Sequence, residues 1–258
     1  SSPSTGRPTM TARPSSARPP DSSQKMGRTY RWTRHVHDRT RPYYLLGRDA
    51  MLDQIARRPG GRVLEVGCGT ARNLHVLDDQ APQHTLYGLD PSLAMLATAR
   101  EKLERAGCTE RVHLAQGLAE DLRPEKQFGV DKPFDIIFFS YVLSMIPSWG
   151  TALTAALHHL APDGRLYIVD FWDQANPPSL VETALQRWLR LFEVESRPDL
   201  LHTLHQLDAN GRLSCSITPV ARRYAYLATV AHRDDGSKES DQPRTPGHSD
   251  VSFKSKRV

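Results

Sequence analysis

Hydrophobic residues in the middle of the chain occur in short runs separated by stretches of mixed polarity. Five runs predict strands of a parallel sheet, at 62–66, 85–90, 111–116, 134–140 and 164–171. The fourth run, FDIIFFS, is apolar on both faces of the predicted strand, as expected of a central strand that helices cover on both sides. Two later runs, 213–220 and 223–231, predict a closing antiparallel pair.

Helices are predicted between these strands. One follows a glycine turn at 67–69 and runs to about 79; the others are expected at 43–57, 91–106, 149–160, 179–193 and 198–208. Pro91 and Ser92 are typical of a helix start and Gly107 of its end, and Pro162 is expected to end the helix at 149–160. The alternation predicts a doubly wound α/β fold with an antiparallel C-terminal strand pair.

Both ends of the chain differ in composition from this middle part. Residues 1–29 are rich in Ser, Pro, Thr and Arg and predict a disordered basic tail, and 232–258 predict a second polar tail. Scarce acid in residues 1–26 also resembles an organelle targeting segment, although no amphipathic pattern supports that alternative. One domain is therefore expected at 30–231.

Charge and cysteine content narrow the class of protein. Residues 30–62 hold eight Arg and three Asp, a net charge of +5, which suggests an anionic partner, either a membrane surface or nucleic acid. No run of about 18 apolar residues predicts a spanning helix. The three cysteines follow no metal or disulfide spacing, so we expect reduced thiols, no metal site and a cytoplasmic protein.

The segment EVGCGTARN (65–73) directly follows the first predicted strand. Gly67 and Gly69 allow a sharp turn and close approach to a ligand, and the next helix presents free N–H groups. Asp90 ends the following strand, where a carboxylate accepts hydrogen bonds from ribose hydroxyls. The combination predicts a nucleotide-containing cofactor.

The glycine pattern distinguishes between two cofactors. A dinucleotide-binding motif G-x-G-x-x-G needs a third glycine where Arg72 stands. EVGCGTA instead resembles the motif of class I S-adenosylmethionine (SAM)-dependent methyltransferases, with Ala71 in place of its third glycine. This resemblance implies a Rossmann-like sheet and SAM as the cofactor. It places Gly67, Cys68 and Gly69 in the cofactor loop, Glu65 near the methionine amino group through an intervening contact, and Asp90 at the ribose.

The same resemblance places the other parts of the SAM site. Adenine recognition falls on QGLAED (116–121), where Leu118 stands in place of the usual Asp, so it rests on the backbone of Leu118 and Ala119 or on Glu120. Ser140 and Tyr141 are expected beside the methionine end. Tyr141 is equally interpretable as a packed aromatic residue.

Three stretches resemble a narrower family, the diacylglyceryl homoserine N-methyltransferases of betaine lipid synthesis. They are RHVHDRTRPYYLLGRD (34–49), RVLEVGCGTARNL (62–74) and FFSYVLSMIPSW (138–149). The resemblance implies three successive methylations of a homoserine amine on a lipid, an N-terminal lid over the active site at 30–60, and an aminocarboxypropyl transferase as a possible partner.

Several residues suit an amino acid headgroup. Arg41 and Arg48 are candidates for its carboxylate, which arginine binds in a bidentate pair, although Arg48 also has Asp49 and Asp53 as neighbours. Aromatic candidates for the methyl-transfer site, which would face the developing cation, are Tyr43, Tyr44 and Tyr141. His37 or Asp38 is a candidate for the proton released by the amine.

The sequence also bears on other acceptors. The chain lacks an Asn/Asp-Pro-Pro-aromatic motif after the fourth strand, and its tryptophans form no base-stacking pattern, which argues against nucleic acid. A quinone precursor or phosphoethanolamine remains an alternative acceptor, and a non-catalytic SAM-binding regulatory protein a further one. A lipid acceptor predicts peripheral docking through the basic stretch. Trp188 and Phe192 are candidates for insertion, although packing of their helix against the sheet is the favoured expectation.

Overall fold

The computed structural model describes residues 45–172, 198–221 and 223–233. Their strands form one seven-stranded sheet in the order β3-β2-β1-β4-β5-β7-β6. The bounds are β1 (Arg62–Val66), β2 (Thr85–Asp90), β3 (Val112–Gln116), β4 (Phe134–Ser140), β5 (Leu160–Phe171), β6 (Leu213–Val220) and β7 (Ala225–His232). Strands β1 to β5 pair in parallel, and β7 pairs antiparallel with β5 and β6. The predicted doubly wound sheet with its antiparallel pair is confirmed.

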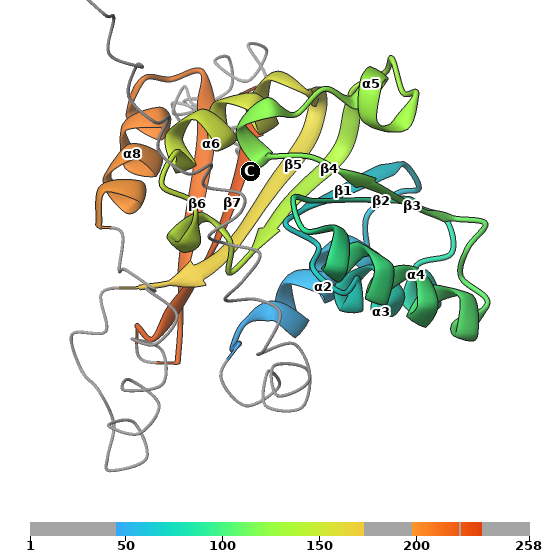
Figure 1. Ribbon diagram of the computed structural model, residues 1–258. Helices are drawn as coiled ribbons and strands as arrows, with labels where there is room; N and C mark the ends of the chain where they lie inside the picture. Colours follow the sequence, from blue (N-terminus) through green and yellow to red (C-terminus); the bar gives the residue numbers. More distant parts are fainter. Residues whose placement is uncertain (1–44, 173–197, 222, 234–258) are drawn as a thin grey trace, which may run out of the picture.

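Helices cover both faces of this sheet (Figure 1). One face packs against α2 (Arg48–Ala56), α3 (Arg72–Gln80) and α4 (Leu93–Ala106); the other packs against α6 (Trp149–His158) and α8 (Pro198–Ala209). Shorter elements are η2 (Ala119–Asp121), α5 (Pro124–Phe128) and η3 (Leu143–Met145). Strand residues alternate between the two cores: Val63 belongs to the first and Leu64 to the second.

Some element boundaries differ from the sequence prediction. The helix expected at 43–57 begins at Arg48 because Gly47 adopts a left-handed backbone, and residues 43–44 lie outside the described residues. The helix expected at 149–160 ends at His158 because Leu160 already pairs with Phe134, so the proline expected to end that helix lies within β5. The helix expected at 179–193 lies outside the described residues.

The C-terminal boundary of the fold lies slightly beyond the expected one. Strand β7 continues through His232, and the Arg233 N–H donates to the Arg212 carbonyl at 3.1 Å. The Arg233 side chain also pairs with Asp208 at 2.9 Å. His232 is therefore the last residue of β7, and Arg233 is tied to the turn before β6, although the polar tail was expected to begin at 232.

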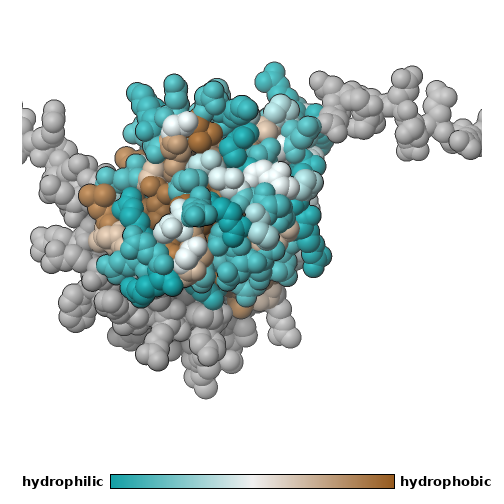
Figure 2. All heavy atoms as spheres, turned by 90° about the vertical axis from the view of Figure 1, so that its right-hand side faces the viewer, coloured by the Kyte–Doolittle hydropathy of each residue, from teal (hydrophilic) through white to brown (hydrophobic). Residues whose placement is uncertain are grey.

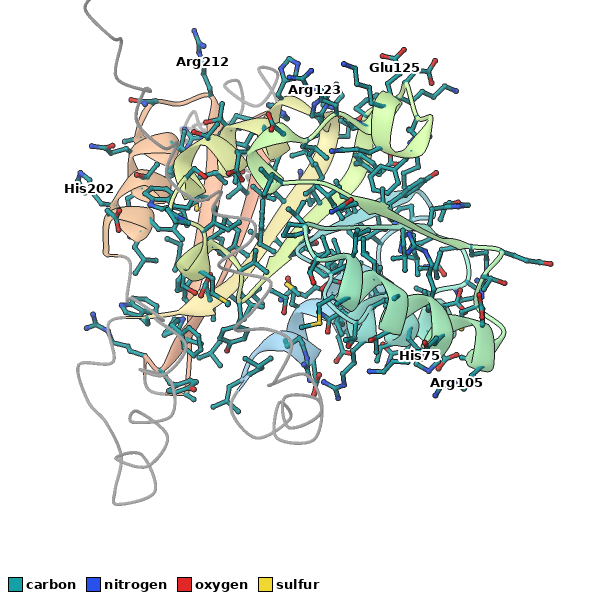
Figure 3. The ribbon with its side chains drawn as sticks, in the orientation of Figure 1. His75, Arg105, Arg123, Glu125, His202 and Arg212 are labelled. Atoms are coloured by element: carbon teal, nitrogen blue, oxygen red, sulfur yellow. The ribbon has the colours of Figure 1, made fainter. Side chains whose placement is uncertain are left out.

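The surface of the described part is mainly polar. Figure 2 shows the side that faces right in Figure 1, where hydrophilic residues dominate and apolar residues occur mainly in the left half of the view. In Figure 3, His75 and Arg105 lie on the opposite side of the molecule from Arg123 and Glu125. No helix within the described ranges is both long enough and apolar enough to cross a membrane.

Candidate functional site

The glycine loop lies at the carboxyl ends of β1 and β2. Gly67 and Gly69 both have positive φ angles, of 77° and 54°. The N–H groups of Gly67 and Cys68 donate to the Leu89 carbonyl at 2.7 and 3.0 Å, which joins the loop to the end of β2. The predicted strand–loop–helix arrangement is therefore present, with α3 starting directly behind the loop.

Asp90 organises the second side of this loop. It is 8% exposed, and its Oδ2 accepts the Gly69 N–H at 2.8 Å while its Oδ1 accepts the Ser92 N–H at 2.9 Å. A carboxylate oxygen has two acceptor sites, so these bonds are compatible with further hydrogen bonds from ribose hydroxyls. The geometry fits the ribose role predicted for Asp90.

Glu65 lies beneath the loop at the end of β1. It is 2% exposed, and its Oε1 accepts a hydrogen bond from the Asn73 side-chain nitrogen at 2.6 Å. Asn73 belongs to the first turn of α3, so this contact joins β1 to the helix that follows the loop. Sequence reasoning did not assign a role to Asn73, because its partner is recognisable only once strand and helix are packed together.

Cys68 lies inside the loop as a neutral thiol. Burial raises its pKa well above the usual value, and the negative charges of Asp90 and Glu65 raise it further. Cys68 therefore has no character of a nucleophile here. The same two carboxylates make this edge of the sheet electrostatically suited to a cationic cofactor such as a sulfonium.

The segment after β4 forms the facing wall of the loop. A Cβ added to Gly67 would lie 2.6 and 2.7 Å from the two methyl carbons of Val142. Gly67 therefore has to lack a side chain because of this wall, whereas the sequence alone suggested only the approach of a ligand. Ser140, the last residue of β4, is half-buried beside it.

Tyr141 is a buried residue with a left-handed backbone, φ 57°. Its hydroxyl donates to the Leu46 carbonyl at 2.5 Å, and its ring packs edge-on against Phe171 at 4.7 Å. Burial raises the pKa of Tyr141, with smaller contributions from Tyr224 and Asp170. Tyr141 thus connects the segment before α2 to the end of β4, as the packed-aromatic interpretation requires; its catalytic role stays a prediction.

The expected adenine-binding segment lies at η2. Leu118 is half-buried and Ala119 is 8% exposed. Glu120, the alternative adenine contact, accepts a hydrogen bond from the Ser148 hydroxyl at 2.8 Å, which ties it to the start of α6. The backbone of Leu118 and Ala119 therefore remains the better candidate for adenine.

The residues predicted for the acceptor are only partly within the described structure. His37, Asp38, Arg41, Tyr43 and Tyr44 lie outside the described residues. Arg48 is described, is 3% exposed and begins α2. In the described ranges, no group of three or more His, Cys, Asp or Glu residues has an arrangement that could hold a metal ion.

Comparisons with known proteins agree with this geometry. Residues 64–166 match the family described as "Methyltransferase domain". The chain is 31% identical over 122 residues to trans-aconitate 2-methyltransferase of Azoarcus sp., covering 46% of this chain and 44% of the relative. It is 33% identical over 124 residues to the ubiquinone/menaquinone biosynthesis C-methyltransferase of Vibrio campbellii, covering 46% and 45%. The chain thus matches about half the length of each of these curated relatives.

A third relative is named for a lipid substrate. Phosphatidylethanolamine N-methyltransferase of Cereibacter sphaeroides is 33% identical over 130 residues, covering 50% of this chain and 60% of that protein. Among solved structures, a SAM-dependent methyltransferase from Aquifex aeolicus superposes with a TM-score of 0.55 at 17% identity, covering 78% of this chain and 96% of that one. This likeness shows the class I methyltransferase fold.

Proposed function

We propose that the protein N-methylates the amine of diacylglyceryl homoserine, up to the trimethylated betaine lipid, and that residues 64–166, which match the methyltransferase domain family, bind SAM for this reaction. The proposal joins two kinds of support. The stretches 34–49 and 138–149 resemble that narrower family. One of the similar proteins is named for methylating an amino lipid.

The buried guanidinium of Arg48 is the observation that carries this proposal. Its side chain is 4% exposed, and its ion pair with Asp49 is long, with Nε 3.6 Å from Oδ1 of a carboxylate that is 90% exposed. The Nε atom is buried and has no hydrogen-bond partner in the described structure. A buried charge with such weak compensation is costly unless a ligand pairs with it. A carboxylate is the group that suits it.

Arg48 also lies next to the expected methyl-transfer region. The preceding residue, Gly47, lies where an added Cβ would be 3.3 Å from Val169 near the end of β5. Leu46 accepts the Tyr141 hydroxyl at the end of β4. The start of α2 therefore covers the carboxyl ends of β4 and β5, where an acceptor would meet the methionine end of SAM. The homoserine carboxylate would then orient the amine.

The chain's contribution to the chemistry is mainly orientation. SAM supplies an activated methyl group on a sulfonium, so a correctly held neutral amine is sufficient for in-line attack. Gly67 and Val142 shape the cofactor side, and Arg48 holds the acceptor side. The proton that leaves the amine is assigned to His37 or Asp38, as the sequence suggested, directly or through water.

Methylation of another acceptor is the second candidate function. A similar protein is named trans-aconitate 2-methyltransferase, and a small polycarboxylate would also suit Arg48. Another is named for a quinone pathway, and such an acceptor offers Arg48 no carboxylate. Incubating the protein and SAM with diacylglyceryl homoserine, trans-aconitate, a demethylated quinone or phosphatidylethanolamine, followed by mass spectrometry, distinguishes them. If the protein methylates one of the other acceptors and not diacylglyceryl homoserine, the proposal is contradicted.

Replacing Arg48 by Ala is expected to raise the acceptor KM by about 10–100-fold, because a charge-assisted hydrogen-bond pair is lost. SAM affinity, measured by calorimetry, should remain unchanged. Arg48→Lys should recover part of the loss, since it keeps the charge without the bidentate geometry. Arg105→Ala, in the exposed last turn of α4 and outside the basic stretch, is the matched control and should change neither value. An equal fall in SAM affinity would assign Arg48 to the cofactor or the fold.

We further propose that the protein is cytoplasmic and docks reversibly on membranes, where an aminocarboxypropyl transferase would supply its lipid substrate. Arg48 is buried and unavailable for docking, but Arg57 is exposed in the same basic stretch. Binding to vesicles should increase with anionic lipid and weaken at high salt, since the Debye length shrinks from about 10 Å at 0.1 M to about 3 Å at 1 M.

Co-sedimentation with neutral and anionic vesicles at both salt levels tests this docking. Arg57→Glu should weaken binding to anionic vesicles at low salt. Arg212→Glu serves as the control, because Arg212 is an exposed arginine in the turn before β6 (Figure 3). Binding that is indifferent to lipid charge and salt, or no binding at all, would favour a soluble acceptor.

A further inference from the structure

Strand β5 contains one buried acidic residue in its apolar stretch LYIVDF (166–171). Asp170 is 1% exposed and pairs across the strands with Tyr226 of β7. The alternation of β5 places it on the same face as Ile168, which belongs to the core beneath α6 and α8. A carboxylate buried to this extent needs hydrogen bonds or an ion pair to remain there.

Two backbone N–H groups donate hydrogen bonds to Asp170. Its Oδ2 accepts the Ser144 N–H at 3.0 Å, and its Oδ1 accepts the N–H of the adjacent Phe171 at 2.8 Å. Burial raises the pKa of Asp170, and hydrogen bonds from Ser144, Phe171 and Leu143 act in the opposite direction. Ser144 is in the first turn of η3, so the carboxylate satisfies an N–H group that the turn leaves without an internal partner.

From Ser144 a short path leads to the glycine loop. The η3 turn begins after Val142, whose carbonyl accepts the Met145 N–H at 3.0 Å. Val142 is the residue whose methyl carbons lie within 2.7 Å of the Cβ position of Gly67. The position of Ser144 therefore fixes the turn, and the turn fixes how closely Val142 faces Gly67.

We propose that Asp170 is a positioning residue of the SAM site. It does not touch the cofactor; it holds Ser144, and through the η3 turn it sets the place of Val142 opposite Gly67. This wall borders the methionine end of SAM and lies away from Asp90, which faces the ribose. The proposal rests on the SAM site and is independent of the identity of the acceptor.

Comparing two ligands separates this role from a general contribution to stability. In Asp170→Asn, an amide NH₂ replaces one acceptor oxygen and would face a backbone N–H, so one of the two bonds is lost. SAM affinity measured by calorimetry should fall about tenfold, whereas the affinity for adenosine, which lacks the methionine part, should not change. Val142→Ala removes the wall without touching a buried charge and should produce the same selective loss.

Asp135→Asn is the matched control. Its Oδ2 accepts the Arg62 N–H at 2.7 Å at the amino ends of β1 and β4, the edge opposite the site, and its loss should change neither affinity. Equal weakening of SAM and adenosine in Asp170→Asn, or unchanged SAM affinity in a protein whose circular dichroism is native, overturns the proposal. If Asp170→Asn does not fold, Val142→Ala decides, and normal SAM binding by that variant also overturns it.

Discussion

Gly67→Val is expected to abolish measurable SAM binding. Gly67 has a φ of 77°, which a β-branched residue adopts only with strain, and an added Cβ would lie 2.6 Å from Val142. Left-handed backbone and overpacking together cost about 2–5 kcal/mol. The loop relieves this by moving away from Val142, and its N–H bond to Leu89 is lost with that movement.

Gly129→Val provides the matched control for Gly67→Val. Gly129 has a similar φ of 69°, but an added Cβ would meet no atom within 4 Å. This variant should lose about 1–2 kcal/mol of unfolding free energy through strain alone and should bind SAM normally. Calorimetric titration and thermal unfolding of both variants make the comparison. Normal SAM binding by Gly67→Val would place SAM elsewhere. An equal loss of SAM affinity in both variants would show that backbone strain alone, without a clash, explains the effect.

The sheet was predictable because its signal is local. A run such as FDIIFFS at 134–140 is apolar on both alternations, and it forms the central strand β4 with the expected bounds. The helix start at Ser92 was equally readable, since its hydroxyl accepts the Met95 N–H at 3.3 Å. The end of the helix expected at 149–160 was predicted wrongly because strand pairing overrides the local helix preference. Leu160 enters β5 because it pairs with Phe134 of the neighbouring strand.

The cofactor loop was predictable for a related reason, since its glycines have to be contiguous with a strand and a helix. Ala71 stands where the family motif has a third glycine, and the structure explains the motif, because Ala71 adopts a left-handed backbone with φ 57°. A glycine takes that conformation without steric cost. The substitution is therefore tolerated at the expense of local strain in the residue that precedes α3.

Other site residues could not be predicted because their partners are distant in sequence. Asn73 is meaningful only through Glu65, Val142 only through Gly67, and Asp170 only through Ser144. For Asp170 alone, the sequence contains a signal: an acidic residue inside the apolar stretch of β5 is unusual for a strand that helices cover on both faces. Buried charges in apolar strands thus indicate long-range partners even where the sequence does not identify them.

Asp90→Ala is the second variant for which a large effect is expected. The carboxylate is 8% exposed, holds the Gly69 and Ser92 N–H groups, and is the predicted ribose acceptor. Alanine removes all of these bonds together, so SAM affinity should fall by about 1.5–3 kcal/mol, or about 10–150-fold. Asp90→Asn keeps one acceptor oxygen and should lie between alanine and the native residue.

A thermodynamic cycle that combines the Asp90 substitution with a change of ligand separates the hydrogen bonds between Asp90 and the ribose from those that hold the glycine loop. Native protein should bind adenosine more tightly than 2′,3′-dideoxyadenosine, because only adenosine donates hydroxyl hydrogens to the carboxylate. In Asp90→Ala both ligands should bind weakly and with nearly equal affinity, since the acceptor of those hydrogens has been removed. If the variant weakens both ligands but keeps the full difference between them, Asp90 supports only Gly69 and Ser92, and the ribose hydroxyls bind to another group.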